Sequence, residues 1–317
     1  MLVASLEILS EALPMKIYED KYIKSNNCVI AFGNFDGVHN GHKYLLNKAK
    51  EYARFNGLDF GVYTFADSPK FAYADHSILT TLQSRLSLLE ESINPDFVYL
   101  EKFDKVRDMS PCEFVCYFTE MFGCECAFCG ENFRFGKNAE GTSDLLVKLM
   151  KDSGRTSVVV KSLEYDGDVV SSSGIRKLIS DGEVDKAHNL LGYYFGFSSK
   201  VVHGAHLGNK LGFPTINQVL PEELVYPKYG VYASIVVYND KEYMGVTNFG
   251  VKPTVSSGNT PVAETFIIDF DGDVYDEYVR LCFVERLRDE KTFSSLNELR
   301  DNIAENVEQT KRLFGEK

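Results

Sequence analysis

The chain has 317 residues, more than a single hydrophobic core usually organises, so two domains are expected. Its hydrophobic fraction of 44% and charged fraction of 25% are those of a folded globular protein and exclude extensive intrinsic disorder. The formal net charge is −12, which disfavours a broad nucleic-acid-binding surface.

The sequence also indicates in which compartment of the cell the protein is located. It contains no run of 18 apolar residues, so no membrane-spanning helix is expected. The first 27 residues lack a basic leader and carry Glu7 and Glu11 within their apolar stretch, which disfavours a secretory signal. We therefore expect a cytoplasmic protein whose seven cysteines are free thiols. No pattern in the sequence indicates an oligomeric state.

Up to about residue 187 the chain alternates strand-like and helix-like segments. Strands are predicted over residues 28–32, 59–65, 96–100, 124–129 and 157–161. Helices are predicted over residues 44–55, 79–93, 111–121 and 143–150, with two short helices after Ser173. This alternation predicts a Rossmann-like α/β domain with a mainly parallel sheet covered on both faces.

From residue 193 onward the pattern changes to short β segments without intervening helices. These segments cover residues 194–202, 231–238, 242–248, 263–270 and 279–283. They predict an antiparallel β-barrel, and residues 296–313 predict a C-terminal helix. We place the boundary between the domains near residue 187, giving domains over residues 1–187 and 188–317.

Residues 33–42 (GNFDGVHNGH) form the most informative segment, because they follow an apolar strand and open a helix. Free backbone N–H groups and the helix dipole favour an anion at such a position. His39 and His42 stand three residues apart at the helix entrance and can donate hydrogen bonds to phosphate oxygens. The plain alternative is a helix-capping loop with two incidental histidines, but the complete strand–turn–helix context favours phosphate binding.

Residues 171–176 (SSSGIR) provide a second candidate phosphate site. Three hydroxyls stand at the start of a short helix, and Arg176 follows one turn later, where it can neutralise a phosphate. The plain alternative is a serine N-cap with a solvated arginine. The histidine segment upstream favours the phosphate-binding interpretation.

The segment over residues 33–42 resembles the GxFDGxHxGH signature of the nucleotidylyltransferase superfamily. From about Cys28 onward the chain is similar to the bacterial bifunctional riboflavin kinase/FAD synthetases. The resemblance implies an FMN adenylyltransferase in the first domain, with His39, His42 and Arg176 in catalysis. It implies nucleotide binding by Gly33, Asn34, Phe35, Asp36, His39, Gly41, His42, Ser171, Ser172, Ser173 and Arg176.

The loop over residues 130–136 (GENFRFG) also resembles that family and implies flavin binding by Asn132, Phe133 and Arg134. Its phenylalanines can contact an isoalloxazine ring or simply anchor the loop. Two departures bear on adenylyl transfer. Residues 64–69 read TFADSP where the family has Thr-Phe-x-Pro-His-Pro, so a histidine is missing near Ser68, and Ser173 replaces a threonine.

The second domain carries a glycine-rich segment over residues 204–217, which lacks the Walker pattern GxxxxGK[ST] and by itself is a barrel turn. Residues 214–217 (PTIN) resemble the PTAN motif of riboflavin kinases. The resemblance implies nucleotide binding by Gly208, Lys210, Gly212, Pro214, Thr215 and Asn217, with Mg²⁺ held by Thr215 and Asn217. It also implies that Glu264 is the general base, where the plain alternative is a surface glutamate on a strand.

These resemblances imply that riboflavin and ATP give FMN, and that FMN and ATP give FAD and pyrophosphate, with Mg²⁺ as cofactor. The FMN phosphate is already ionised and needs no base, whereas the riboflavin hydroxyl benefits from one. The expected partners are these small molecules alone, with no nucleic acid and no membrane. The alternatives are a riboflavin kinase with weak or lost adenylyl transfer, and a non-catalytic flavin or nucleotide sensor.

The cysteines favour no metal site. Cys124, Cys126 and Cys129 offer three thiols, but strand alternation places the first two on one face and the third on the other. No second pair completes a tetrahedral set, so buried strand cysteines are expected. Cys112 and Cys116, four residues apart, are expected on the core face of a helix.

Overall fold

A computed structural model describes residues 15–19, 27–67, 77–203, 212–251 and 261–315. The chain divides into two compact units. We call the first the sheet unit; it comprises residues 1–35, 42–69 and 86–162. We call the second the barrel unit; it comprises residues 36–41, 70–85 and 163–317.

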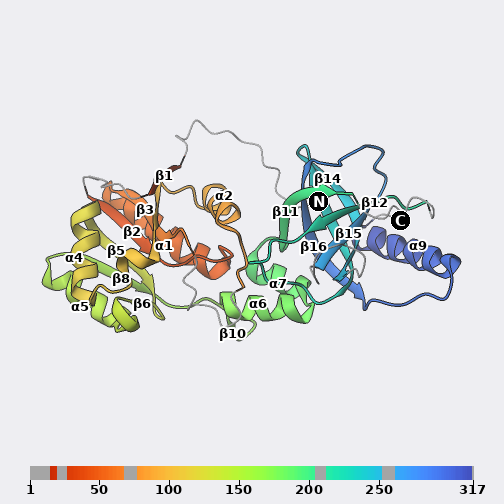
Figure 1. Cartoon of the computed structure of the whole chain (residues 1–317). Coiled ribbons are helices and arrows are strands. Elements are labelled where there is room, and N and C mark those ends of the chain that lie inside the picture. The colour runs from red at the N-terminus through yellow and green to blue at the C-terminus, as the bar shows by residue number, and fades with distance from the viewer. Residues whose placement is uncertain (1–14, 20–26, 68–76, 204–211, 252–260, 316–317) are drawn as a thin grey trace. The chain divides into compact units, whose positions relative to one another are not determined.

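The sheet unit is built on a six-stranded sheet in the order β1-β4-β3-β2-β5-β8, in which every neighbouring pair is parallel (Figure 1). The strands are β1 (Lys16–Glu19), β2 (Cys28–Phe32), β3 (Asp59–Phe65), β4 (Phe97–Glu101), β5 (Cys124–Gly130) and β8 (Thr156–Val160). All five residues of β2 are buried, as expected of a central parallel strand covered on both faces.

Helices cover both faces of this sheet. They are α1 (Asn40–Asn56), α2 (Leu82–Ser92), α3 (Phe103–Val106), α4 (Pro111–Phe122) and α5 (Ser143–Asp152). On one face, Phe118 of α4 and Met150 of α5 pack against Phe32 and Tyr99 of the strands. On the other, the ring of Tyr52 in α1 meets that of Phe128, with centroids 5.5 Å apart.

The barrel unit contains a closed antiparallel barrel in the strand order β11-β12-β15-β14-β13-β16. The strands are β11 (Gly196–Val202), β12 (Thr215–Val219), β13 (Gly230–Tyr238), β14 (Lys241–Val251), β15 (Pro261–Ile267) and β16 (Tyr278–Arg288). Its interior holds buried side chains such as Phe197, Tyr232, Phe249 and Phe283. Outside the barrel, Val307 of α9 (Leu296–Leu313) packs against Val231 and Val246. Two helices, α6 (Ser172–Asp181) and α7 (Val184–Leu191), precede the barrel.

The expected fold class is confirmed: a parallel α/β part is followed by an antiparallel barrel and a C-terminal helix. Several short elements were not predicted. They are β1, β12, α3, the hairpin of β6 (Arg134–Phe135) and β7 (Gly141–Thr142), the 3-10 turn η1 (Lys137–Ala139), and the hairpin of β9 (Glu164–Tyr165) and β10 (Asp168–Val169). Four of these strands have only two residues, too few for a periodic pattern to appear in the sequence.

The cysteine expectations had mixed outcomes. Cys124, Cys126 and Cys129 are buried free thiols, as expected. The expectation for α4 was wrong, because Cys112 and Cys116 are exposed. Phe114 and Phe118, also four residues apart, occupy the buried face of that helix instead.

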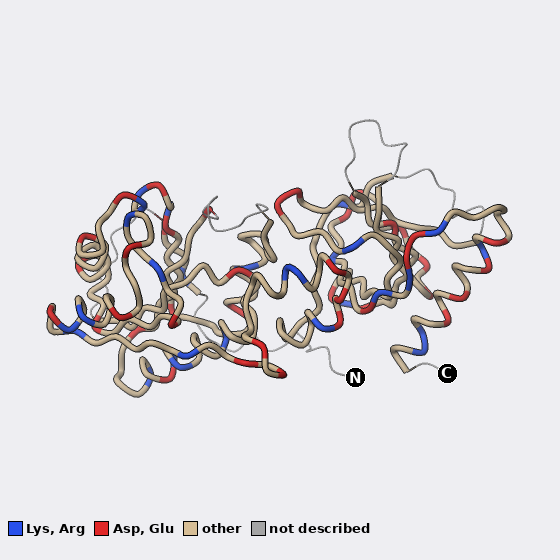
Figure 2. Tube along the Cα trace, turned by 90° about the horizontal axis from the view of Figure 1, so that it is seen from below, with Lys and Arg blue, Asp and Glu red and all other residues tan. Residues whose placement is uncertain are grey.

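Charges of both signs occur along the elements of each unit, including α9, which carries Glu298 and Asp301 as well as Arg300 and Lys311 (Figure 2). Within the described ranges, every helix is too short or too polar to pass through a lipid bilayer. The residues that the sequence analysis singled out lie mainly in two parts of this fold, the loop before α1 and the outer face of the barrel.

Candidate functional site

The loop between β2 and α1 has an unusual backbone. Phe35, Gly37 and Val38 have φ angles of 50°, 80° and 35°, all in the left-handed region. Such angles are costly for a bulky or β-branched residue, so the surroundings must hold the loop in place. At Gly37, a β-carbon would also lie 2.7 Å from Cδ1 of Leu79. Glycine at position 37 is therefore required by both conformation and space.

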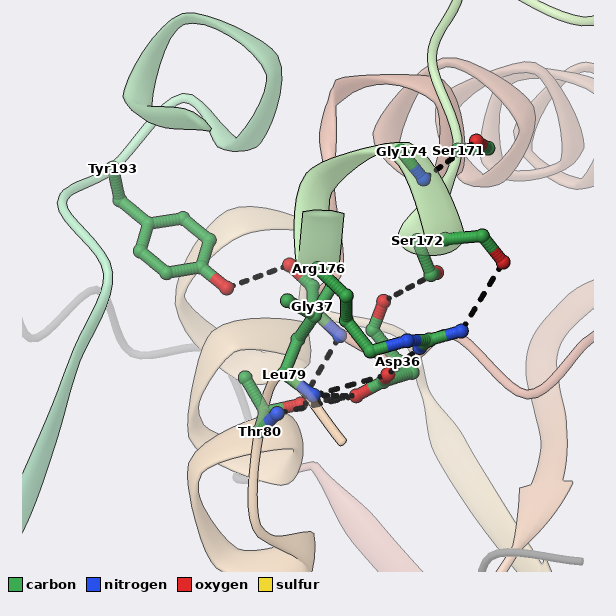
Figure 3. Close-up of polar contacts among 10 residues, drawn as sticks. Asp36, Gly37, Leu79, Thr80, Ser171, Ser172, Gly174, Arg176 and Tyr193 are labelled. Carbon is green, nitrogen blue, oxygen red and sulfur yellow. Dashed lines mark hydrogen bonds and ion pairs between the residues drawn. The ribbon is translucent and has the colours of Figure 1, made fainter. Parts of the chain in front are cut away.

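Asp36 organises the part of this loop that belongs to the barrel unit. Its carboxylate is buried and accepts hydrogen bonds from the backbone N–H groups of Leu79 at 2.9 Å and Thr80 at 3.1 Å. It also forms an ion pair with Nη1 of Arg176 at 2.9 Å (Figure 3). Burial raises the pKa of Asp36, and the backbone N–H groups and Arg176 oppose this only in part. The structure thus joins the aspartate of the first motif to the arginine of the second, 140 residues away.

Each serine of the second motif has a partner within the barrel unit. Ser171 caps α6 by accepting a hydrogen bond from the N–H of Gly174, as the plain alternative predicts. Ser172 donates to the Asp36 carbonyl at 3.0 Å, and Ser173 accepts from Nη2 of Arg176 at 3.2 Å. Arg176 is only 8% exposed, so the alternative of a solvated arginine is wrong.

The two histidines lie at the start of α1. His39 is buried, and Gly41 leaves room for its ring, because a β-carbon at position 41 would lie 3.2 Å from the imidazole. Within the sheet unit, the half-buried ring of His42 meets the ring of Phe35 edge to face at 5.3 Å. Both residues precede or occupy the first turn of a helix, where backbone N–H groups favour an anion.

The end of β2 is tied to the neighbouring strand β3. The Gly33 N–H donates to the Tyr63 carbonyl at 3.2 Å, and Thr64 Oγ1 donates to the Asn34 carbonyl at 3.0 Å. In the segment that lacks the family histidine, Asp67 accepts a hydrogen bond from the N–H of Phe103. Ser68, where that histidine would stand, lies outside the described residues.

In the candidate flavin loop, the two phenylalanines differ in how deeply they are buried. Phe135 is buried against Phe114, with ring centroids 5.5 Å apart, and so anchors the loop. Phe133 is half-buried and stacks on Phe135, with an interplanar angle of 17°. Asn132 and Arg134 are exposed. Phe133 therefore remains the ring of this loop that a flavin can reach.

The second candidate site is a cavity of about 280 Å³ on the outer face of the barrel, lined by strand residues and by α9. Strand register explains how the polar residues on this face of the barrel meet, although Asn217 does not itself line the cavity. Glu264 of β15 is paired with Asn217 of β12 on one side and with Asn248 of β14 on the other. Directly paired residues share a face of the sheet, so these three side chains form one row. Thr215 Oγ1 donates to Glu264 Oε1 at 2.9 Å and orients that carboxylate.

Arg288 of β16 lies at the end of this row. Its register partner is Val231, which is paired in turn with Asn248. Arg288 Nε donates to Oδ1 of the buried Asn306 in α9 at 3.1 Å, and its guanidinium lies over the Phe293 ring at 5.7 Å. Of the expected nucleotide-binding residues, Gly208 and Lys210 lie outside the described residues, and Gly212 and Pro214 are exposed just before β12.

Five residues of these sites were not singled out from the sequence as site residues. They are Thr80, Tyr193, Asn248, Arg288 and Asn306. Asn248 could have been found from strand alternation once the register of β14 with β15 was known, and Arg288 only from the further register of β16 with β13. No local pattern points to Thr80, Tyr193 or Asn306 as site residues.

Among the described residues, no three His, Cys, Asp or Glu side chains gather where they could hold a metal ion together. Thr215, Asn217 and Glu264, on one face of the barrel, instead offer hydroxyl, amide and carboxylate oxygens. Such hard oxygen donors suit Mg²⁺, which commonly takes few protein ligands and completes its shell with water and substrate phosphates.

Comparisons with known proteins cover both sites. A family model described as FAD synthetase matches residues 21–174, and one described as riboflavin kinase matches residues 191–314. The chain is 30% identical over 308 residues to the bifunctional riboflavin kinase/FMN adenylyltransferase of Bacillus subtilis, covering 95% of this chain and 96% of that protein. It is 32% identical over 294 residues to the protein of the same name from Escherichia coli K12, covering 91% and 93%.

Among solved structures, the chain is similar to a macrolide-efflux protein from Streptococcus pneumoniae. The TM-score is 0.84 and the sequences are 28% identical, with 94% of this chain and 99% of that one covered. This likeness shows that the two chains share a fold. The similarity to each of these three proteins extends across more than nine-tenths of the chain.

Proposed function

Because the chain belongs to the family of bifunctional riboflavin kinase/FMN adenylyltransferases, we propose that it makes FMN from riboflavin and FAD from FMN. The observation that carries the proposal is that one chain has both the Asp36–Arg176 loop and the Glu264–Thr215 cavity. We assign adenylyl transfer to residues 1–187 and riboflavin phosphorylation to residues 188–317.

In the kinase reaction, the riboflavin 5′-hydroxyl attacks the γ-phosphorus of ATP, giving FMN and ADP. The proton of that neutral hydroxyl passes to Glu264, whose carboxylate Thr215 orients at 2.9 Å. The half-buried position of Glu264 in the cavity suits a group that meets substrate. The nucleotide is assigned to Gly208, Lys210, Gly212, Pro214, Thr215 and Asn217.

Thr215 and Asn217 would hold Mg²⁺, because Asn217 is the register partner of Glu264 and the Thr215 hydroxyl hydrogen-bonds Glu264. When bound, Mg²⁺ supplies neutralisation of the charge on the ATP phosphates. The residues of the chain supply the remaining functions: they place the hydroxyl, accept its proton and shield the cavity with α9.

In the adenylyl reaction, a phosphate oxygen of FMN attacks the α-phosphorus of ATP, and pyrophosphate leaves. The nucleophile is already ionised, so no general base is needed. We assign stabilisation of the phosphate charge to His39, His42 and Arg176, and flavin contact to Asn132, Phe133 and Arg134. The remaining nucleotide contacts are assigned to Gly33, Asn34, Phe35, Asp36, Gly41, Ser171, Ser172 and Ser173.

We further assign the protein to the cytoplasm, where riboflavin, FMN and ATP would be its only partners. Incubating the pure protein with riboflavin, ATP and Mg²⁺ and separating the flavins tests the function. Formation of both FMN and FAD is expected. FMN alone would mean that adenylyl transfer is lost, consistent with the missing histidine near Ser68, and neither product would indicate a sensor.

A further inference from the structure

The peptide of Gly37 is held from both sides. Its N–H donates to Thr80 Oγ1 at 3.1 Å, and its carbonyl accepts from the Tyr193 hydroxyl at 2.7 Å. Figure 3 shows the two side chains approaching Gly37 from different segments of the barrel unit. Neither Thr80 nor Tyr193 belongs to the two phosphate motifs.

The loop needs such restraint. Gly37 and Val38 both have positive φ, a backbone conformation that a β-branched residue such as Val38 rarely adopts. An unrestrained loop would relax toward ordinary backbone angles and turn the peptides that follow Gly37. Those peptides lead directly into His39 and the first turn of α1.

Both partners are themselves firmly placed. Thr80 is 8% exposed, and its neighbour Ile78 forms a β-bridge with Leu224. Backbone hydrogen bonds of 2.8 Å join Ile78 to Glu223 and to Val225. Tyr193 lies between α7 and β11, and burial raises its pKa, so its hydroxyl keeps its proton and donates at neutral pH.

We propose that Thr80 and Tyr193 are positioning residues for adenylyl transfer, which hold Gly37 so that the backbone N–H groups after it and His39 face the phosphates of ATP. The inference rests on the proposed function. It adds that the segments next to the barrel, rather than the sheet, fix the shape of the loop over residues 36–41. Tyr193 acts through the Gly37 carbonyl, whereas the Thr80 hydroxyl holds the Gly37 N–H and also donates to Oδ1 of Asp36 at 3.4 Å; neither residue need touch substrate.

Tyr193→Phe and Thr80→Val test the proposal in the full chain, because each removes one hydroxyl with little change in volume. One neutral hydrogen bond corresponds to about a 2- to 12-fold change in rate. Each variant should therefore form FAD from supplied FMN about 2- to 12-fold more slowly in kcat/KM. FMN formation from riboflavin should match the parent protein, and the thermal midpoint should fall only by what the lost hydrogen bonds contribute to stability.

Two controls separate positioning from general damage. Tyr194→Phe makes the same change at the adjacent residue, whose ring stacks on His188, and should leave FAD formation unchanged. Thr80→Ser keeps the hydroxyl and should restore most of the activity that Thr80→Val loses. Because both residues hold one peptide, the double variant should lose less than the product of the single losses.

FAD formation at the parent rate in both Tyr193→Phe and Thr80→Val would overturn the inference. So would an equal fall of FAD and FMN formation together with a lower thermal midpoint, since that pattern indicates a purely structural role. A parent protein that forms FMN but no FAD would instead overturn the proposed function, and the inference with it.

Discussion

Asp36 places a carboxyl group in a buried loop. A buried carboxylate is costly unless it is paired, and Asp36 has Arg176 and two backbone N–H groups as partners. The same pairing partly neutralises Arg176. In the proposed function, the N-terminus of α1 and hydrogen bonds from His39 and His42 therefore stabilise the phosphate together with Arg176.

Replacing both His39 and His42 with Ala tests this reasoning. Removing one preorganised donor from a transition state typically lowers the rate about 10²–10³-fold. We expect the double variant to lose at least about 100-fold in FAD formation from FMN, while riboflavin phosphorylation stays at the parent rate. Flavin products separated by chromatography measure both rates in one sample. Unchanged FAD formation would contradict the role of the two histidines.

At the scale of elements, the outer face of the barrel depends on α9. Strand alternation puts Asn217, Glu264 and Asn248 on the face away from the barrel interior, and α9 packs over part of that face. The contact between Arg288 and Asn306 joins β16 to this helix. The cavity is therefore formed by a strand face and a helix together.

Asn306→Ala would leave Nε of Arg288 without this acceptor. A hydrogen bond to a charged group is worth about 1.5–3 kcal/mol, so we expect a loss of stability of that size in urea unfolding. Riboflavin phosphorylation should fall as Arg288 loses its position, and FAD formation from supplied FMN should not.

Asn302→Ala is the matched control for this prediction. Asn302 lies one turn earlier on the same helix, and its amide donates to the Glu298 carbonyl at an exposed position. This variant should change neither activity. Equal effects of both substitutions would mean that α9 is merely sensitive to mutation.

The sequence was informative wherever periodicity or a complete motif was present. The strand over residues 59–65 and the helix over residues 296–313 have the predicted bounds. β12 was not predicted, because its five residues directly follow a glycine- and proline-containing turn. The Tyr193–Gly37 contact joins residues 156 positions apart, so no local pattern could reveal it. Cys112 and Cys116 had the right spacing for a buried face, but larger aromatic residues took it.

At the scale of the whole molecule, the compact units are not continuous along the chain. Residues 36–41 belong with the barrel unit, although the strand just before them belongs to the sheet unit. A linear division at residue 187 therefore separates the loop from contacts such as Tyr193. We expect changes at those contacts to affect FAD formation even though they lie outside residues 1–187.

Metal content is a property of the whole purified protein. The buried thiols of Cys124, Cys126 and Cys129 have raised pKa values, caused mainly by burial, which disfavours the thiolate that zinc requires. We expect elemental analysis to find no stoichiometric zinc, and chelation of Mg²⁺ to stop both reactions. One zinc per chain that disappears when the three cysteines are replaced would contradict this.

The last prediction separates the two activities within one chain. Glu264→Gln keeps the size of the side chain and an oxygen for Thr215, but it removes the proton acceptor for the riboflavin hydroxyl. General-base assistance is typically worth about 10²–10⁴-fold, so riboflavin phosphorylation should fall on that scale. The adenylyl nucleophile is already ionised, and the Gly37 contacts are untouched, so supplied FMN should still give FAD at the parent rate. Normal phosphorylation in a folded variant would rule out Glu264 as the base. A parallel fall of both activities would show that the cavity and the loop over residues 36–41, which share one compact unit, cannot be altered separately.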